Sequence, residues 1–439
     1  MSDFGRTLRE MLEGRWRNPE TALVDRPLPI ADIRLMDTTD GAEADLIAPL
    51  DLGRSLAVVS DPRTHDAMGG RVARALGRIA TVTDVVIEAV EATDEEIAAL
   101  AGRTTGADAL VAVGSGTLQD IVKHATFLDG RPFATFATAA SMAGYTSVTA
   151  SVTRGGMKLS LPSHLPRGLF LDIGVAARAP RFLAQAGLGD CLCRTTAQVD
   201  WRLSAALLGT PYREVPFLMQ APYETHLLAE AKGIGTGAPE AIETLYAMLL
   251  LVGLGSVYTG TSHHGSMSEH LVSHWIDMFA GPAHPGTTHG MQVGFASVSM
   301  SRLQHLVLDA DAPPDLREMR IDEAAIRARY GPGFADAVLS AFRAKQAEAG
   351  DPAGLRARME DWESFREGLR AVMLPTEVLV RALDDAGAPA TAAAARLARS
   401  VYRDALLHAR EIRNRYSILD VAADSGVLAG FAEAEAGWG

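Results

Sequence analysis

The sequence predicts two domains: an α/β domain with a parallel sheet over residues 1–180 and an all-helical domain over residues 181–439. Before residue 180, short apolar runs alternate with segments of helical spacing, which is typical of parallel strands joined by helices. After that point, long Ala- and Leu-rich segments keep helical spacing and convincing strands disappear. The length of the chain, 439 residues, also suggests two domains.

The elements of the first part follow in a regular order. A short helix over 6–12 precedes an extended lead-in that is broken by prolines up to about residue 50. Strands are predicted at 55–60, 81–88, 109–113 and 133–136, and helices at 65–77, 95–101 and 118–127. In the second part, helices are predicted at 190–208, 239–257 and 267–279, with several more from 323 to the end.

Composition excludes several classes of function. A net charge of -13 argues against nucleic acid or an anionic membrane as the main partner, although a positive pocket can still bind a small anion. The two cysteines, Cys191 and Cys193, are too close to form an unstrained disulfide, which fits a reducing cytoplasm. No signal peptide is visible, and the longest apolar run, 247–257, is too short to span a membrane. We therefore expect a cytoplasmic protein without membrane insertion.

Histidines gather in one stretch of the second part. His270 and His274 lie four residues apart on one face of a predicted helix, and His289 opens the next apolar segment. Glu269 and Asp277 stand beside them. Imidazole is the commonest protein ligand for a divalent metal, so the pattern favours a metal site. The alternative is a set of core histidines bonded to backbone groups.

A glycine loop follows the strand predicted at 109–113. Gly114-Ser-Gly-Thr117 opens a helix, where backbone N–H groups and the helix dipole favour a pyrophosphate. The loop lacks the third glycine of the dinucleotide fingerprint, and a tight turn without a ligand is the alternative. A second hydroxyl-rich loop, Thr138-Ala-Ala-Ser141, follows the next strand. Two such loops at adjacent strand ends favour nucleotide binding.

Five motifs together resemble the sn-glycerol-1-phosphate dehydrogenases, especially their bacterial branch, over about residues 30–330. The motifs are Gly114–Asp120, Thr138–Ser147, Gly187–Asp190 with Asp200-Trp201, Ser268–His270 and His289-Gly290. That family belongs to the superfamily of glycerol dehydrogenases, iron-dependent alcohol dehydrogenases and dehydroquinate synthases. The resemblance implies the dehydroquinate synthase-like fold, with an N-terminal Rossmann-like domain and a C-terminal helical domain.

The resemblance also implies one divalent metal, Zn²⁺, Ni²⁺ or Fe²⁺, held by Asp190, His270 and His289. Iron-type relatives have a fourth ligand at the position of Arg194 here, so we expect three protein ligands and an open position. His274 would relay a proton or orient the substrate; its alternative is a packed or capping histidine. Arg194 and Lys158 are candidates to neutralise a substrate phosphate, although Arg194 can equally be a solvated surface charge.

On the cofactor side, the family pattern implies NAD(H) or NADP(H) held by residues of both loops. These are Gly114, Ser115, Gly116, Thr117, Asp120, Thr138, Ser141 and Lys158. Asp120 also lies near the nicotinamide in this pattern and is a candidate catalytic residue. Asp61, after the first strand, is a candidate for the adenosine part, although Asp-Pro is also an ordinary turn signal.

The implied reaction is reduction of dihydroxyacetone phosphate to sn-glycerol 1-phosphate, by hydride transfer to a metal-polarised carbonyl. One departure is Ala143, where relatives have Asp or Asn beside the substrate hydroxyls. It motivates an alternative dehydrogenase for another polyol or for a phosphorylated or phosphonylated aldehyde or ketone. A sugar-phosphate cyclase and a non-catalytic nucleotide-binding protein are the further alternatives. Apolar helices in the second part leave room for a homodimer or a higher oligomer.

Overall fold

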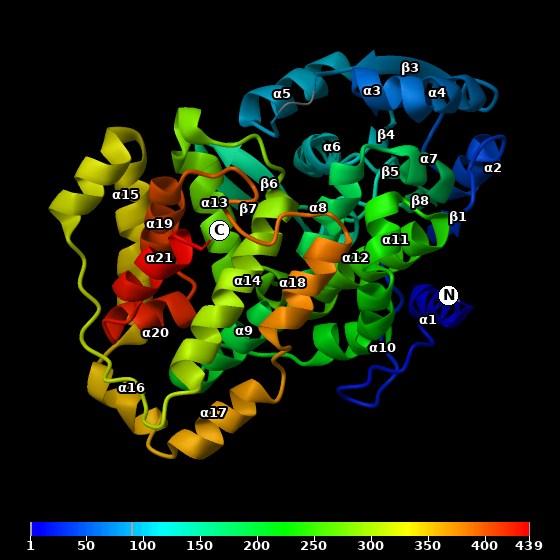
Figure 1. Cartoon of the computed structure of the whole chain (residues 1–439). Helices are drawn as coiled ribbons and strands as arrows, with labels where there is room; N and C mark the ends of the chain where they lie inside the picture. Colours follow the sequence, from blue (N-terminus) through cyan, green and yellow to red (C-terminus); the bar gives the residue numbers. More distant parts are fainter. Residues whose placement is uncertain (1, 89–90, 439) are drawn as a thin grey trace. The chain divides into compact units, whose positions relative to one another are not determined.

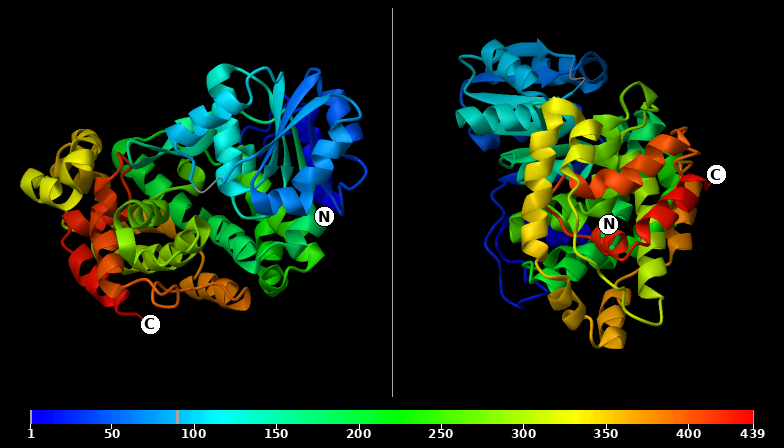
Figure 2. Two further views of the ribbon diagram at one scale, coloured as in Figure 1. Left: turned by 90° about the horizontal axis from the view of Figure 1, so that it is seen from above. Right: turned by 90° about the vertical axis from the view of Figure 1, so that its left-hand side faces the viewer.

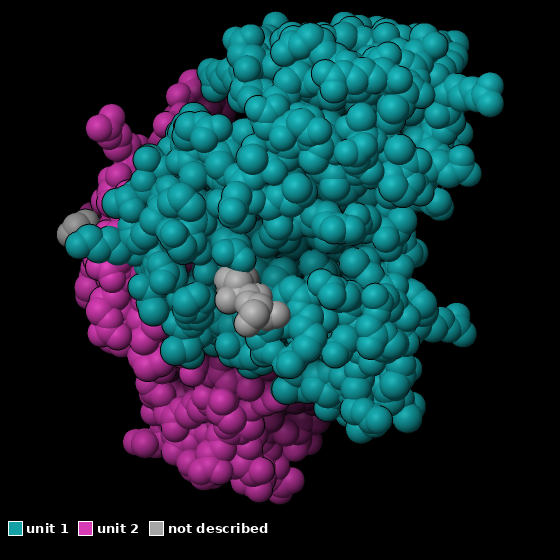
Figure 3. All heavy atoms as spheres, turned by 90° about the vertical axis from the view of Figure 1, so that its right-hand side faces the viewer, with its two compact units in different colours: residues 1–154, 158–187, 214–261 teal, residues 155–157, 188–213, 262–439 magenta. Residues whose placement is uncertain are grey.

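The computed structural model describes residues 2–88 and 91–438 (Figure 1). The chain forms two compact units, which Figure 3 colours separately. Unit 1 comprises Met1–Arg154, Lys158–Gly187 and Glu214–Thr261. Unit 2 comprises Gly155–Met157, Leu188–Arg213 and Ser262–Gly439. The single boundary predicted near residue 180 marks the change from strands to helices, whereas the compact units divide the chain at several points.

Unit 1 is built on a sheet in which every pairing is parallel. Among the described residues its six strands are β1 (Asp32–Met36), β2 (Ser55–Ser60), β3 (Thr81–Val86), β4 (Ala109–Gly114), β5 (Phe133–Ala137) and β8 (Gly168–Asp172). Their order across the sheet is β1-β8-β5-β4-β2-β3. A separate two-stranded ribbon joins β6 (Thr149–Arg154) to β7 (Met157–Pro162).

Helices cover both faces of this sheet, as Figure 2 shows. On one face Val58, Val111 and Phe136 pack with side chains of α2 and α4, and on the other Val59 and Ala112 pack with α5 and α6. This alternation explains why the central strands are mostly apolar on both faces, as expected of a buried parallel sheet. The helices of this unit are α1 (Ser2–Leu12), α2 (Glu43–Ile47), α3 (Pro62–Thr64), α4 (Gly70–Leu76), α5 (Asp94–Arg103), α6 (Gly116–Asp129), α7 (Ile173–Arg178), α10 (Val215–Ala229), α11 (Ala231–Thr236) and α12 (Pro239–Thr259).

The helix α12 belongs to unit 1 although it follows the first helices of unit 2 in sequence. It begins with Pro239, whose missing N–H costs nothing at a helix start, and it ends before Gly260 at φ +67°. It packs against α7, α10 and the short helix η3 (Ala143–Thr146). By length and composition it is the one helix of the described residues able to cross a membrane, but 83% of its most apolar window is buried inside the protein.

Unit 2 is helical, with α13 and α14 at its centre. The helix α13 packs against α9, α14 and α19, and α14 also packs against α18 and α20. The helices are the C-terminal end of α8 (Arg181–Leu192), α9 (Arg194–Leu208), α13 (Ser268–Phe279), α14 (His289–Leu308), α15 (Glu323–Ala349), α16 (Pro352–Arg358), α17 (Trp362–Arg370), α18 (Thr376–Asp385), α19 (Arg399–His408), α20 (Ile418–Asp424) and α21 (Leu428–Ala436).

The predicted α/β order of the first part is confirmed, and β2 has the predicted bounds. Two strands of the sheet were not predicted. β1 lies in the segment read as an extended lead-in, and β8 is a five-residue strand, Gly168–Asp172, between β5 and β1. Both are short, so their apolar patterns are too brief to separate from an irregular segment.

Candidate functional site

The three predicted metal ligands come together in unit 2. Asp190 lies near the end of α8, His270 in the first turn of α13, and His289 at the start of α14. Their donor atoms all lie within 4.8 Å of one another, and Asp190 Oδ1 is 3.6 Å from His270 Nε2. Two ligand atoms at ordinary zinc distances in a tetrahedron are about 3.4 Å apart. The spacing therefore fits one divalent ion.

A close approach of two backbones sets this geometry. Gly189 precedes Asp190, and a Cβ built on it would lie only 2.0 Å from the carbonyl oxygen of Gly290. Gly290 in turn follows His289. Only glycine at position 189 allows α8 and α14 to meet here, which brings the Asp190 carboxylate beside the His289 imidazole.

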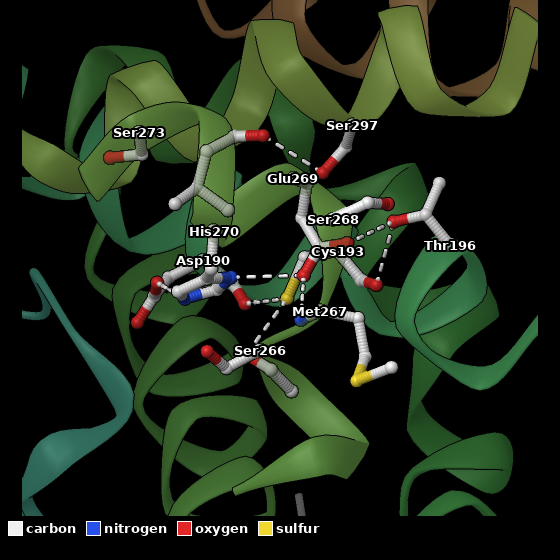
Figure 4. A network of polar contacts seen from close by, with 12 residues as sticks. Asp190, Cys193, Thr196, Ser266, Met267, Ser268, Glu269, His270, Ser273 and Ser297 are labelled. Carbon is white, nitrogen blue, oxygen red and sulfur yellow. Dashed lines mark hydrogen bonds and ion pairs between the residues drawn. The ribbon is translucent and has the colours of Figure 1, made fainter. Parts of the chain in front are cut away.

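Glu269 orients the His270 ring, as Figure 4 shows. Its fully buried carboxylate accepts from His270 Nδ1 at 3.0 Å and from the Met267 backbone N–H at 2.7 Å. Thr196 Oγ1 donates to its other oxygen at 3.2 Å. With its proton on Nδ1, His270 presents Nε2 toward Asp190. Burial opposes a charge on His270, but hydrogen bonds with Asp190 and Glu269 outweigh it and raise the pKa of the imidazole.

A second hydrogen-bond chain orients His289. Ser273 Oγ donates its proton to Gln292 Oε1 at 2.7 Å. Ser273 Oγ therefore acts as the acceptor toward His289 Nδ1, which lies at the same distance, 2.7 Å. His289 therefore offers Nε2 to an ion, as His270 does. Such outer partners fix the tautomer of metal-binding imidazoles.

Cys193 also lies close to Glu269 and His270, and the three could form a different ligand set. Its thiol, however, donates to the Asp190 carbonyl oxygen at 3.1 Å. Burial, together with the nearby carboxylates of Glu269 and Asp190, raises the pKa of Cys193 well above its ordinary value. Of the two sets, the family resemblance implies Asp190, His270 and His289. Both cysteines are free, as the sequence predicts.

His274 lies one turn after His270 on α13, and its side chain is buried. Its ring packs 5.2 Å from that of His289 and 6.1 Å from that of His270, centroid to centroid. Arg413 Nη2 lies 3.1 Å from His274 Nδ1. The guanidinium can only donate, so Nδ1 accepts and the proton of a neutral ring sits on Nε2.

Arg194, considered either for the substrate phosphate or as a solvated surface charge, is only 7% exposed. The surface interpretation is therefore wrong. Its Nη1 donates to Gln198 Oε1 at 2.8 Å within α9.

The predicted cofactor residues lie in unit 1, several of them at one edge of the sheet. Asp61 follows β2, Ser115 follows β4 and Thr138 follows β5, and these three strands are neighbours. Parallel strands end at the same edge, so the three positions lie at the carboxyl ends of adjacent strands, the usual ligand edge of an open α/β sheet. The Asp61 carboxylate accepts from the backbone N–H groups of Arg63 and Thr64, so it caps α3.

The glycine loop has the backbone that a tight strand-to-helix turn requires. Ser115 is extended, and Gly116 has φ +43°, in the left-handed region that favours glycine. A Cβ on Gly116 would meet no atom within 4 Å, so the space beside it is open. Thr117 stands in the first turn of α6, whose N-terminal N–H groups can bind an anion.

Asp120 and Lys123 stand one turn apart on α6. Burial raises the pKa of Asp120 to about 6, against the opposing charges of Lys123 and Lys158. Burial lowers the pKa of Lys123 to about 8, which Asp120 opposes. Lys123 Nζ donates to the carbonyl oxygens of Gly144, Ser147 and Thr149 at 2.5, 2.9 and 3.2 Å.

Lys123 thereby fixes the loop that contains Ala143, which lies in η3. Ala143 is the position where the sequence departs from the family that it resembles. The buried Thr138 and Ser141 lie just before it, and Lys158 lies on β7. Sequence reasoning passed over Lys123, although a lysine in the otherwise buried middle of a helix is a signal of a specific partner.

Comparison with known proteins first identifies the structural class of the protein. The family described as iron-containing alcohol dehydrogenase matches residues 36–180. The crystal structure of glycerol dehydrogenase from Schizosaccharomyces pombe has a TM-score of 0.58 with this chain at 16% identity, over 92% of this chain and 89% of that one. The chain has the two-domain fold of the superfamily of glycerol dehydrogenases and iron-containing alcohol dehydrogenases, as predicted.

Two curated relatives give the family. Glycerol-1-phosphate dehydrogenase (NAD(P)+) from Bacillus licheniformis is 27% identical over 418 residues, 94% of this chain and 93% of that protein. The protein of the same name from Thermofilum pendens is 32% identical over 247 residues, 56% of this chain and 70% of that protein. The chain belongs to the glycerol-1-phosphate dehydrogenase family and is an NAD(P)-dependent enzyme of the alcohol dehydrogenase type.

Proposed function

We propose that this enzyme uses NAD(P)H and one divalent metal to reduce dihydroxyacetone phosphate reversibly to sn-glycerol 1-phosphate. The observation that carries the proposal is the cluster of Asp190, His270 and His289, with donor atoms within 4.8 Å of one another. The names of the relatives support the phosphorylated polyol as the product.

The donor set fits a catalytic metal. One carboxylate and two imidazoles, each imidazole oriented through its Nδ1, leave a fourth position for water or substrate. A divalent ion held there would polarise the substrate carbonyl as a Lewis acid. Zn²⁺, Ni²⁺ and Fe²⁺ all suit such ligands, so the donor set does not select among them.

The cofactor would be held by the glycine loop, residues 114–117, by Thr138 and Ser141 and by Lys158, with Asp61 toward the adenosine. Backbone N–H groups at the start of α6 would bind its pyrophosphate, and NAD(P)H would supply the hydride. Asp120, with its pKa of about 6, would be largely ionised at neutral pH and, as the family pattern implies, would lie near the nicotinamide.

His274 would orient the oxygen that becomes the product alcohol. The neutral ring accepts from Arg413 at Nδ1 and carries its proton on Nε2, from which it can donate a hydrogen bond to that oxygen. The proton that the alkoxide requires would come from water. Its ring packs on two of the three proposed ligands, so it lies beside the reacting group.

Ala143 supports a second candidate, a dehydrogenase for another polyol or for a phosphorylated or phosphonylated aldehyde or ketone. A methyl group there cannot hydrogen-bond a substrate hydroxyl, and losing such a partner costs about 1–3 kcal/mol of discrimination. Turnover of a substrate panel by the wild type and by Ala143→Asp distinguishes the two. The first candidate predicts that the carboxylate leaves dihydroxyacetone phosphate the preferred substrate; undetectable turnover in both proteins favours the second.

The direct test is oxidation of NADH and NADPH by metal-reconstituted protein with dihydroxyacetone phosphate, beside a chelated control. We expect turnover that requires the metal. No turnover, with metal and cofactor both bound, would contradict the proposed substrate but leave the site intact.

Variants of the ligands test the site separately. Asp190→Ala and His270→Ala should each lose metal in a competition titration with a chelator, and each should lose activity. If both variants keep metal and activity, the ligand assignment is wrong. Asp277→Asn is the matched control, because Asp277 lies on the same helix, α13, outside the proposed ligand set, and its carboxylate contacts His284.

A further inference from the structure

Two arginines from the C-terminal part of the chain lie beside the metal cluster within unit 2. Arg413 and Arg415 stand in the segment that joins the short helix η6 (Ala409–Glu411) to α20. Both side chains are half-buried. Neither residue falls in the sequence motifs that suggested the site.

Their contacts connect them to the metal ligands. Arg413 Nη2 lies 3.1 Å from His274 Nδ1, and the His274 ring packs against the rings of His270 and His289. Arg415 donates to the carbonyl oxygen of Ser266 and, at 2.8 Å, to Ser262 Oγ. It therefore holds the turn that leads into the ligand helix α13.

The two guanidinium groups concentrate positive charge at this point. Burial lowers the pKa of Arg413 to about 10. Burial, and then the like charge of Arg413, lower the pKa of Arg415 to about 9, and Glu269 opposes the change. Both groups stay charged at neutral pH, although the chain as a whole carries a net charge of -13. Such a concentration of positive charge favours an anion as the ligand of this region.

We propose that Arg413, supported by Arg415, binds the phosphate monoester of the substrate while the carbonyl lies at the metal. A guanidinium presents parallel N–H donors that match phosphate oxygens, and it binds phosphate more specifically than lysine does. Arg194 and Lys158 stay the candidates that the sequence suggested for the phosphate, and this subsite is an additional one. The inference rests on the proposed function, because it names the residues that would recognise the substrate's charged end.

The discriminating experiment compares a phosphorylated substrate with its neutral analogue. We expect Arg413→Met to lower kcat/KM for dihydroxyacetone phosphate about 100-fold, as loss of one partner of a charged pair does. Because Arg413 also fixes the tautomer of His274, turnover of dihydroxyacetone, which lacks the phosphate, should fall as well. The ratio of kcat/KM for the phosphorylated substrate to kcat/KM for the neutral one should nevertheless fall at least about tenfold. Arg413→Lys keeps the positive charge but not the parallel N–H donors of the guanidinium. It should therefore lower kcat/KM for dihydroxyacetone phosphate less than Arg413→Met does. Arg343→Met, which removes a surface arginine paired with Glu323, is the matched control.

The comparison separates recognition from structure. Arg413 also contacts His274, so a variant that only misplaced His274 would lose both substrates equally and would contradict the inference. A phosphate could also come from the cofactor, as the 2′-phosphate of NADPH. Arg413→Met could raise the KM for NADPH relative to NADH and leave unchanged the ratio of kcat/KM for dihydroxyacetone phosphate to kcat/KM for dihydroxyacetone. In that case the subsite does not bind the substrate phosphate.

A binding measurement separates this inference from the proposed function. Inorganic phosphate is titrated into metal-free, NADH-saturated protein, in which neither the metal nor the pyrophosphate site can take it. We expect calorimetry to detect phosphate binding by the wild type and by Arg343→Met. In Arg413→Met the affinity for phosphate should fall at least about tenfold, because one charge-assisted hydrogen bond is lost. Binding with this pattern, but without turnover of dihydroxyacetone phosphate, keeps the subsite and rejects the reaction. Equal binding by wild type and Arg413→Met, or none by either, overturns the subsite.

Discussion

The proposed cofactor loop and the proposed metal centre are built in opposite ways. In unit 1 the glycine loop offers backbone N–H groups at a strand end, and its side chains are small. In unit 2 the ligands are side chains from α8, α13 and α14, and each imidazole has its own hydrogen-bond partner. The first site depends on the backbone conformation of its loop, and the second on the hydrogen bonds that orient its buried side chains.

This contrast predicts which substitutions matter in each place. A site made of backbone donors tolerates changes of side chain but not of backbone conformation. A site made of buried side chains is sensitive to every partner in its network, because an oriented imidazole loses metal affinity when its outer partner goes. The four substitutions below test that difference, from the largest expected effect to the smallest.

Gly189→Ala should have the largest effect, because it disrupts a close backbone contact on which the proposed metal centre depends. The new Cβ would lie 2.0 Å from Gly290 O, so α8 and α14 must separate. We expect about 3 kcal/mol or more of destabilisation, the upper end for overpacking, and loss of metal. Urea unfolding and metal analysis measure both. Gly368→Ala, a helical glycine with nothing within 4 Å of its Cβ position, should be neutral or stabilising; equal effects would contradict the close approach.

Glu269→Ala should weaken metal binding without touching the ligands. The His270 ring loses the acceptor that holds its tautomer, and such a loss costs about 10–100-fold in affinity. Chelator competition measures it, and NADH binding should stay the same because the cofactor residues lie in the other unit. Unchanged metal affinity would mean that His270 is oriented by packing alone.

Asp120→Asn should change the pH dependence of stability. The native carboxyl has a pKa of about 6, above its ordinary value of 3.8, so the folded state keeps its proton longer than the unfolded chain does. The free energy of unfolding therefore falls as pH rises from about 4 to about 6, by about 1–3 kcal/mol for this group. Urea midpoints across pH 4–8 should show a smaller fall in the variant than in the wild type. Identical profiles would show that Asp120 titrates normally.

Gly116→Ala should have the smallest effect on stability and a clear effect on the cofactor. An alanine at φ +43° costs about 1–2 kcal/mol, since nothing else stands in the way of its methyl group. If the loop binds pyrophosphate, the dissociation constant for NADH rises while metal content stays constant. A variant with wild-type NADH affinity would place the cofactor elsewhere.

The sequence predicts the two sites unequally, for the same reason that they differ in construction. The glycine loop is local: a strand, two glycines and a helix stand next to one another, so the pattern can be read directly. Asp190 lies in an apolar helix with no local sign of a ligand, and only the family resemblance points to it. Glu269 stands beside the histidines, but its partner Thr196 is far away in sequence, as are Arg413 and Arg415. Contacts of that kind arise from packing and leave no periodic signal.

The fold shows the same limit. Short apolar runs predicted the strands β2, β4 and β5. The strand β8 is five residues long and lies between β1 and β5, and a local sequence pattern does not show which strands will be its neighbours. The apolar helix α12 was predicted as a helix, but a helix that is apolar all round does not reveal which unit it completes.

The chain passes from unit 1 to unit 2 and back, which limits the order in which the units can fold during synthesis and the fragments into which the chain can be divided. The sheet unit is finished only when residues 214–261 have been synthesised, after α9 of the other unit has already left the ribosome. A gene fragment ending at residue 187 would lack α10 and α12 and leave η3 and α7 without their covering helix. Such a fragment would expose apolar surface and aggregate. Cutting the chain at a single junction therefore cannot separate unit 1 from unit 2, and a fusion or recombination at one junction would disrupt both units.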